Sequence, residues 1–139
     1  MTEELKIKDF TTIVVSKLQE LQTSGLPDVV LENPKATSKF PCIVVQSPLV
    51  FIERTGVLQR FSVSVENWAK KKYDVYDQAD LVDSKLREMN FIKTSTPIDF
   101  YDEITGCYRY GGSYEVLYNV LLNTFKNMFY RGLGFGVWG

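Results

Sequence analysis

The side chains with the greatest chemical potential in this chain are few. The sequence contains no histidine, which removes the commonest general base and the commonest metal ligand. Its two cysteines, Cys42 and Cys107, stand in apolar, strand-like segments with no visible general-base partner. Because a buried free cysteine packs like a small apolar side chain, we expect both thiols to be reduced and inert.

Three carboxylates, Asp99, Asp102 and Glu103, cluster in the segment IDFYDEITG. Oxygen ligands at such spacing could hold a divalent cation, and the matching enzyme would be a small metal-assisted hydrolase. The segment lacks the EF-hand pattern, and acidic loops are usually just solvated. We therefore expect no metal site, no cofactor and no catalytic residue, and keep the hydrolase as an alternative hypothesis.

Neither a nucleotide loop nor a nucleic-acid site is indicated. The run GLGFG carries glycines at 132, 134 and 136, but no strand–turn–helix unit follows it. The net charge of −1, from 16 basic and 17 acidic side chains, gives no long-range field for DNA or an anionic membrane. No apolar run approaches the ~20 residues of a membrane span. A nucleic-acid-binding module remains a minor alternative.

The length and composition fit one globular domain. The chain has 139 residues, of which 45% are hydrophobic and 24% are charged. The first residues, MTEELKIKDF, lack the apolar centre of a secretion signal, so we expect synthesis in the cytoplasm. We assign residues 1–125 to a single domain and residues 126–139 to an apolar, glycine-rich C-terminal arm.

Two segments have helical periodicity, one in residues 9–24 and one in residues 73–89. In each, apolar side chains recur at steps of three and four residues and form one face. The aspartates of the second segment occupy its opposite side and predict a solvated acidic face. The first stripe comprises Phe10, Ile13, Val14, Leu18 and Leu21, and the second Val75, Ala79, Val82, Leu86 and Met89.

The remaining apolar runs predict strands. We expect short strands at residues 29–31 and 43–45, then a hairpin of residues 49–53 and 57–66 that turns near Gly56. In its second strand Phe61, Val63 and Val65 alternate with Arg60, Ser62, Ser64 and Glu66, which predicts one core face and one polar face.

The C-terminal half of the domain predicts a loop and a closing strand. Residues 91–107 read as a loop with one short apolar segment. Residues 108–125 predict a strand pair or one long strand, with a possible bulge at Gly111 and Gly112. Without a bulge, the tyrosines at 108, 110, 114 and 118 share one face. The fold class is therefore α+β, a mostly antiparallel or mixed sheet of four to five strands with two α-helices packed on one face.

This arrangement resembles the tail-terminator, or tail-completion, family of long-tailed bacteriophages and related phage-tail-like particles. The resemblance covers residues 10–125 and rests on the strand end Glu66–Asn67–Trp68 followed by a helix, and on the entry Lys39–Phe40–Pro41 to an apolar strand. The closing aromatic strand CYRYGGSYEVLYNVLL completes the pattern.

The resemblance implies a structural virion protein and not an enzyme. Family members form a ring, usually a hexamer, at the head-proximal end of the tail. The ring stops polymerisation of the tail tube and offers a surface to the head connector, or to the sheath of a contractile tail. The expected partners are therefore copies of the chain, the tube protein and a connector, neck or sheath protein, with DNA only as passing cargo. A head-completion or connector adaptor ring is the alternative within the same class.

The C-terminal arm is predicted to bind a neighbouring subunit. In an extended segment its odd-numbered apolar residues line one face and its glycines the other, which suits strand addition to a sheet edge. Burial would remove ~500 Å² of apolar surface, about 10 kcal/mol, and ordering about ten residues costs a similar amount, so other contacts must help. Folding back on the domain, or contact with tube or sheath, are alternatives. The predicted interface residues are Phe129, Tyr130, Leu133, Phe135, Val137 and Trp138.

Five basic residues are further candidates for an interface. In a ring around a passage for DNA, Arg54, Arg60 and the cluster Lys70, Lys71 and Lys72 would face the lumen or the tube. The three lysines also fit a solvated turn before the second helix.

Overall fold

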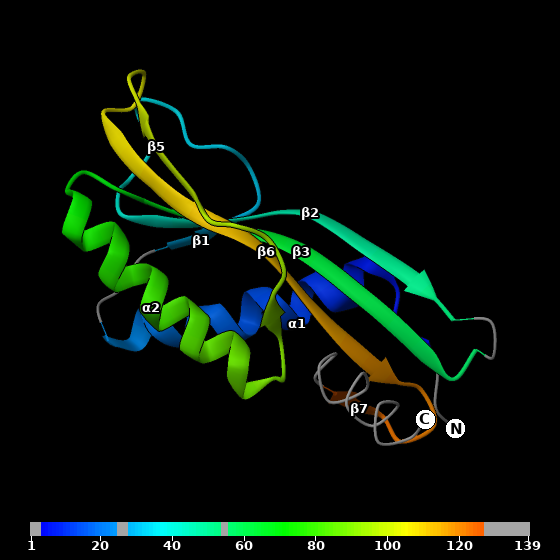
Figure 1. The fold of residues 1–139 in the computed structure, drawn as a ribbon. Coiled ribbons are helices and arrows are strands. Elements are labelled where there is room, and N and C mark those ends of the chain that lie inside the picture. The colour runs from blue at the N-terminus through cyan, green and yellow to red at the C-terminus, as the bar shows by residue number, and fades with distance from the viewer. Residues whose placement is uncertain (1–3, 25–27, 54–55, 127–139) are drawn as a thin grey trace.

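The computed structural model describes residues 4–24, 28–53 and 56–126 (Figure 1). Within these ranges the chain forms two α-helices, one short 3₁₀ helix and seven strands. In chain order they are α1 (Ile7–Gln19), η1 (Glu20–Ser24), β1 (Asp28–Val30), β2 (Cys42–Ile52), β3 (Leu58–Ala69), α2 (Lys72–Glu88), β4 (Ile92–Lys93), β5 (Ile98–Asp102), β6 (Cys107–Asn119) and β7 (Thr124–Lys126).

The strands form one mixed, strongly curled sheet, and both helices pack against it. Its main path runs β1-β2-β3-β6-β4, and β5 and β7 also pair with β6. Only β1 and β2 are parallel, while the long strands β2, β3 and β6 are antiparallel neighbours. The α+β prediction, with a mostly antiparallel or mixed sheet, is confirmed.

Both helices cover one face of the sheet, here called the helix face (Figure 1). Phe10 of α1 stacks on Phe61 of β3 with ring centroids 4.1 Å apart, and Phe91 stacks on the other side of Phe10 at 5.9 Å. From α2, Val82 and Leu86 enter the same cluster. The two helical stripes predicted from the sequence are therefore the surfaces that build this core.

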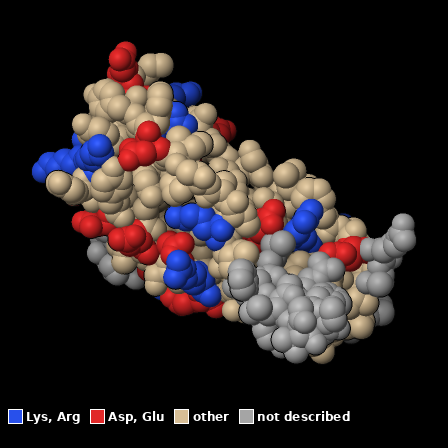
Figure 2. Space-filling view, viewed as in Figure 1, with Lys and Arg blue, Asp and Glu red and all other residues tan. Residues whose placement is uncertain are grey.

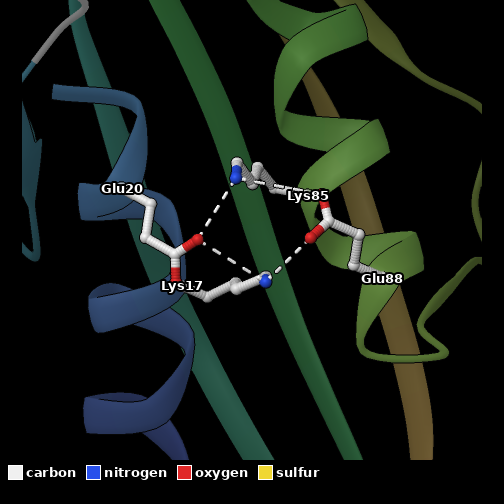
Figure 3. Close-up of polar contacts among 4 residues, drawn as sticks. All are labelled: Lys17, Glu20, Lys85 and Glu88. Atoms are coloured by element: carbon white, nitrogen blue, oxygen red, sulfur yellow. Dashed lines mark hydrogen bonds and ion pairs between the residues drawn. The ribbon is translucent and has the colours of Figure 1, made fainter. Parts of the chain in front are cut away.

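An ion-pair network joins the two helices at the surface (Figure 3). Lys17 of α1 lies 2.9 Å from Glu88 of α2, and Lys85 of α2 lies 3.1 Å from Glu20, just beyond α1. Because these side chains are partly exposed, water and salt screen the attraction. The network fixes how the helices face one another more than it stabilises the fold.

The opposite face of the sheet, here called the outer face, holds a second and smaller cluster. Cys42, Val44, Trp68 and Cys107 are buried together there, with Val30 and Phe40 packed against them. The expectation that Glu66 lies on an exposed polar face is wrong, because Glu66 is only 5% exposed. The alternation of buried and partly buried residues along β3 ends here. From Val65 to Ala69 the side chains on both faces of the strand are buried.

The second strand is longer than predicted. Residues 43–45 and 49–53 were expected as separate strands, but β2 runs without a break from Cys42 to Ile52. Ser47 and Pro48 form a bulge opposite β3, where the register shifts between Gln46 and Leu49. Ser47 has φ +51°. A bulge accepts proline because its missing N–H leaves no gap in the ladder.

The predicted loop at residues 91–107 contains β4 and β5, so that prediction is wrong. Both strands are antiparallel to β6. The β5–β6 turn is closed by Asp102, whose carboxylate accepts hydrogen bonds from the amide and hydroxyl of Thr105 at 2.9 and 2.7 Å. Gly106 takes φ +70° in the same turn.

The last long strand, β6, keeps an unbroken register with β3 from Tyr108 to Asn119. Of the two possibilities at the paired glycines, the unbroken register is the one found, so the tyrosines lie on one face of the strand. Tyr114 and Tyr118 enter the helix-face core, and Tyr110 meets Tyr76 of α2 edge to face at 5.2 Å. The glycines instead permit close approach: a Cβ on Gly111 would lie 2.6 Å from Glu66 Cα and closer still to the Val65 carbonyl oxygen.

Candidate interaction surfaces

The first candidate surface is the far end of β2, residues 49–52, here called the β2 edge. Leu49 and Phe51 are 51% and 45% exposed on the outer face, and Ile52 is exposed on the helix face. Among the described residues, β1 pairs with β2 only as far as Val44. Residues 49–52 therefore have β3 on one side and no strand on the other. Exposed apolar side chains on an unpaired edge are a template for another strand.

Arg60 lies beside this edge. It is the direct partner of Phe51 in the β2–β3 ladder, and its guanidinium carbon is 4.6 Å from the Phe51 ring centroid. Its Nε is buried and finds no hydrogen-bond partner within the described part of the chain. The structure thus places this predicted interface residue on the outer face, next to the exposed apolar side chains.

The second candidate surface is the β5 hairpin, residues 97–107. Ile98, Phe100 and Tyr101 are about half exposed, and Ile104 at the turn is 81% exposed. In the described residues β5 pairs with β6 alone, so its other edge is also unpaired. The exposed residues Ile98 and Phe100 share the outer face with Arg109, the partner of Phe100 in the ladder.

A charged pair on the outer face joins β3 to β6 beside the β5 hairpin. Arg109 Nη2 donates to both carboxylate oxygens of Glu66 at 3.0 and 2.9 Å. The guanidinium lies between the rings of Trp68 and Phe100, 4.5 and 5.3 Å from their centroids. Trp68 is thus a positioning residue on the outer face: it supports the cation that in turn supports the exposed Phe100.

The lysine cluster lies where β3 ends and α2 begins, next to the β5 hairpin. Lys70, Lys71 and Lys72 are all exposed, and Lys72 is the first residue of α2, as a turn before the helix requires. Lys70 also donates to the Thr105 carbonyl and sits 4.8 Å from the centroid of the Phe40 ring. It therefore ties the end of β3 to the β5 hairpin and to the loop before β2.

The remaining predicted interface residues lie outside the described residues. In the sequence Arg54 lies between β2 and β3, and those that follow β7 are Phe129, Tyr130, Leu133, Phe135, Val137 and Trp138. The arm was predicted to begin at residue 126, which is the last residue of β7.

Two of the three carboxylates considered for a metal, Asp99 and Asp102, are bonded to other side chains. Asp99 accepts a hydrogen bond of 2.6 Å from the Tyr76 hydroxyl, which raises the Tyr76 pKa, and Asp102 is held by Thr105. Across residues 4–24, 28–53 and 56–126, no group of three or more acidic, cysteine or histidine side chains is close enough to hold a metal ion.

Neither cysteine is arranged as a nucleophile. Both thiols are free and buried, as predicted. Burial, with smaller contributions from Cys107 and Asp28, raises the pKa of the Cys42 thiol to about 12. A thiol with that pKa stays protonated at neutral pH and is a poor nucleophile.

A groove of about 550 Å³ lies between β1 and the loop that leads to β2. Leu31, Pro34, Lys39 and Cys42 are among the residues that line it. Asn33, which also lines it, accepts a hydrogen bond from Gln46. Of the Lys39–Phe40–Pro41 entry that the tail-terminator resemblance rests on, Lys39 lines this groove.

Charges of both signs are interspersed on the face in view in Figure 2, particularly over α2. Its exposed aspartates Asp74, Asp77 and Asp80 lie in the first half of the helix, and its basic residues are Lys72 at the start and Lys85 and Arg87 in the last turn. This face has no large field of one sign, in keeping with the net charge of −1. Within the described residues, neither helix combines the length and the apolar character that crossing a bilayer requires.

No protein-family model matches this chain, and no curated protein sequence matches it either. The tail-terminator resemblance therefore stays a prediction from the residues quoted above.

Sequence reasoning missed the β5 hairpin and the Glu66–Arg109 pair. The alternation of Ile98, Asp99 and Phe100 was a usable strand signal, but three acidic residues and Pro97 made the segment read as a loop. The pairing of Glu66 with Arg109 depends on the β3–β6 register, which no local pattern reveals.

Proposed function

We propose that this chain is a structural tail protein that forms a ring, hexameric by the resemblance, at the head-proximal end of a phage tail or a tail-like particle. The ring would stop polymerisation of the tail tube and present the attachment surface for the head connector or the sheath. Its partners would be copies of itself, the tube protein and a connector, neck or sheath protein, and it would turn over no substrate.

The observation that carries this proposal is the pair of exposed apolar edges at the two ends of one sheet. A small monomeric protein usually protects such edges with charges, proline or a covering element. Here the β2 edge exposes Leu49, Phe51 and Ile52, and β5 exposes Ile98, Phe100 and Tyr101. A protein that joins to copies of itself head to tail in a ring needs two such surfaces.

The alternatives receive less support. A connector adaptor ring would use the same surfaces, and the symmetry of the assembled ring separates it from a tail terminator. A metal-assisted hydrolase would need Asp99, Asp102 and Glu103 to converge, whereas Asp99 and Asp102 are bonded to Tyr76 and Thr105. If Mg²⁺, Mn²⁺ or Ca²⁺ raised the Tm of the purified chain, that hypothesis would regain weight.

The test is electron microscopy of particles made with and without this protein. We expect its deletion to give tubes of uncontrolled length and heads without tails, and complementation to restore tails of one length. Normal-length tails joined to heads in the deletion strain would contradict the proposal.

A further inference from the structure

We infer that copies of this chain join head to tail through their sheet edges, with the β2 edge of one copy pairing with β5 of the next. The inference rests on the proposed ring function and specifies the contact that closes the ring. It concerns residues 49–52 and 98–102.

Both edges offer unpaired backbone groups. Beyond Val44, β2 pairs only with β3 in the described residues, and β5 pairs only with β6. The Ser47–Pro48 bulge separates the part of β2 that holds β1 from the part that is open. Because β2 and β5 are already formed strands, joining them orders no new backbone.

The exposed apolar side chains of the two edges lie on the same side of the sheet. Leu49 and Phe51 are on the outer face of β2, and Ile98 and Phe100 are on the outer face of β5. If the sheet continues from one copy into the next, its outer face continues too. These four side chains would then become cross-strand neighbours and bury one another.

Charge favours this pairing over the pairing of either edge with itself. The β2–β3 hairpin, residues 46–60, carries Arg54, Arg60 and Glu53, a net charge of +1. The β5 hairpin carries Asp99, Asp102 and Glu103, a net charge of −3. A β5–β5 contact would bring two negative hairpins together, whereas a β2–β5 contact brings opposite charges together.

The positions of the edges determine the kind of assembly. The β2 edge and β5 lie at opposite ends of the molecule (Figure 1). A contact between two different surfaces is heterologous, and its repetition gives a closed ring when the rotation closes. Because the two edges lie at opposite ends, a single β2–β5 contact leaves β5 of one copy and the β2 edge of the other open for further copies.

The experiment is disulfide trapping with mixtures of two full-length variants. Leu49→Cys and Phe100→Cys each place one thiol on an exposed outer-face position, while the native Cys42 and Cys107 are buried. We expect a cross-linked dimer when the two variants are mixed and oxidised, and little when either is oxidised alone. Phe51→Cys with Ile98→Cys is a second pair on the same face, for use if the first disturbs folding or misses the register.

The double variant Leu49→Cys/Phe100→Cys extends the test. It should give a ladder of cross-linked chains that ends at the number of subunits in the closed ring. Leu81→Cys, on the exposed side of α2, mixed with Phe100→Cys is the matched control and should not cross-link.

Several outcomes would overturn the inference. They are a dimer from Leu49→Cys alone, cross-linking of Leu49→Cys to Phe135→Cys of the C-terminal arm in place of Phe100→Cys, or no cross-link in any mixture, free or on purified tails. The deletion experiment is independent: uncontrolled tubes without a β2–β5 cross-link would reject only this contact. The cross-link together with normal tails in the deletion strain would reject only the tail-terminator role.

Discussion

The two faces of the sheet differ in how far their apolar side chains are buried. The helix face is closed by α1 and α2 over an aromatic core in which Phe10 and Phe61 are fully buried. On the outer face the described residues form a small buried cluster around Trp68, while Leu49, Phe51 and Phe100 are about half exposed. The helix face therefore holds the main core of the monomer, and the outer face leaves part of its apolar surface exposed.

The largest expected difference between the faces comes from removing one phenyl ring on each. Phe61→Ala deletes a ring stacked 4.1 Å from Phe10 and should lower the free energy of unfolding by about 4 kcal/mol. Phe51→Ala removes a ring that is 45% exposed and should lower it by less than about 1 kcal/mol. Denaturant unfolding of the monomer measures both, and equal losses would contradict the division between the faces.

The paired glycines Gly111 and Gly112 differ in what surrounds them on the two faces of β6. Gly111→Ala directs a methyl group into the backbone of β3, which cannot move aside, and should cost about 3 kcal/mol of unfolding free energy. Gly112→Ala meets the Ser95 hydroxyl oxygen at 2.9 Å, and since a side chain can rotate away, about 1 kcal/mol is expected. Gly112→Ala is thus the control for Gly111→Ala. A smaller loss of unfolding free energy at Gly111 than at Gly112 would show that the β3 backbone does not lie so close to Gly111.

The outer face carries the partly buried ion pair Glu66–Arg109. Arg109→Met leaves Glu66 buried without its cation and should lower the unfolding free energy by about 2 kcal/mol, less than for a fully buried pair because Arg109 is a quarter exposed. Adding Glu66→Gln should restore at least half of the loss. A double variant no more stable than Arg109→Met would mean that Arg109 acts through its packing on Trp68 and Phe100 alone.

The smallest expected effect concerns the turn of the β5 hairpin. Hydrogen bonds from the Thr105 hydroxyl and amide hold the pKa of Asp102 below its ordinary 3.8. The stabilisation is therefore fully present above pH 3.8 and is lost as the pH falls through the lowered pKa. Thr105→Val should raise the Asp102 pKa, measured by NMR titration, and lower the Tm more at neutral pH than in acid. A Tm difference that is independent of pH would contradict this role.

The sequence predicted the fold well where an apolar periodic pattern faces a single apolar interior. The stripes containing Val14 and Val82 and the alternation of Phe61, Val63 and Val65 predicted the helix-face core because each faces the same apolar interior. Patterns failed where both faces are covered or both are exposed, as at Glu66 in β3 and throughout β5.

The buried polar contacts could not be predicted from local sequence patterns, because their partners lie far apart in the sequence. Gln78 sits within the apolar stripe of α2, where it donates to the Cys42 carbonyl at 2.9 Å and to the Asn67 side-chain oxygen at 3.1 Å. Its polar side chain hid this position from a search for apolar periodicity. The need for it arises only once α2 lies across the paired ends of β2 and β3.

The most direct test of assembly through the outer face and its edges is native mass spectrometry of the full chain at increasing concentration. We predict that the wild type reaches a single closed oligomer and that Leu49→Glu stays monomeric, because a carboxylate on the β2 edge would face the β5 hairpin of net charge −3. Leu81→Glu on α2 should assemble like the wild type. A Leu49→Glu chain that forms the wild-type oligomer at wild-type concentrations would contradict assembly through this edge.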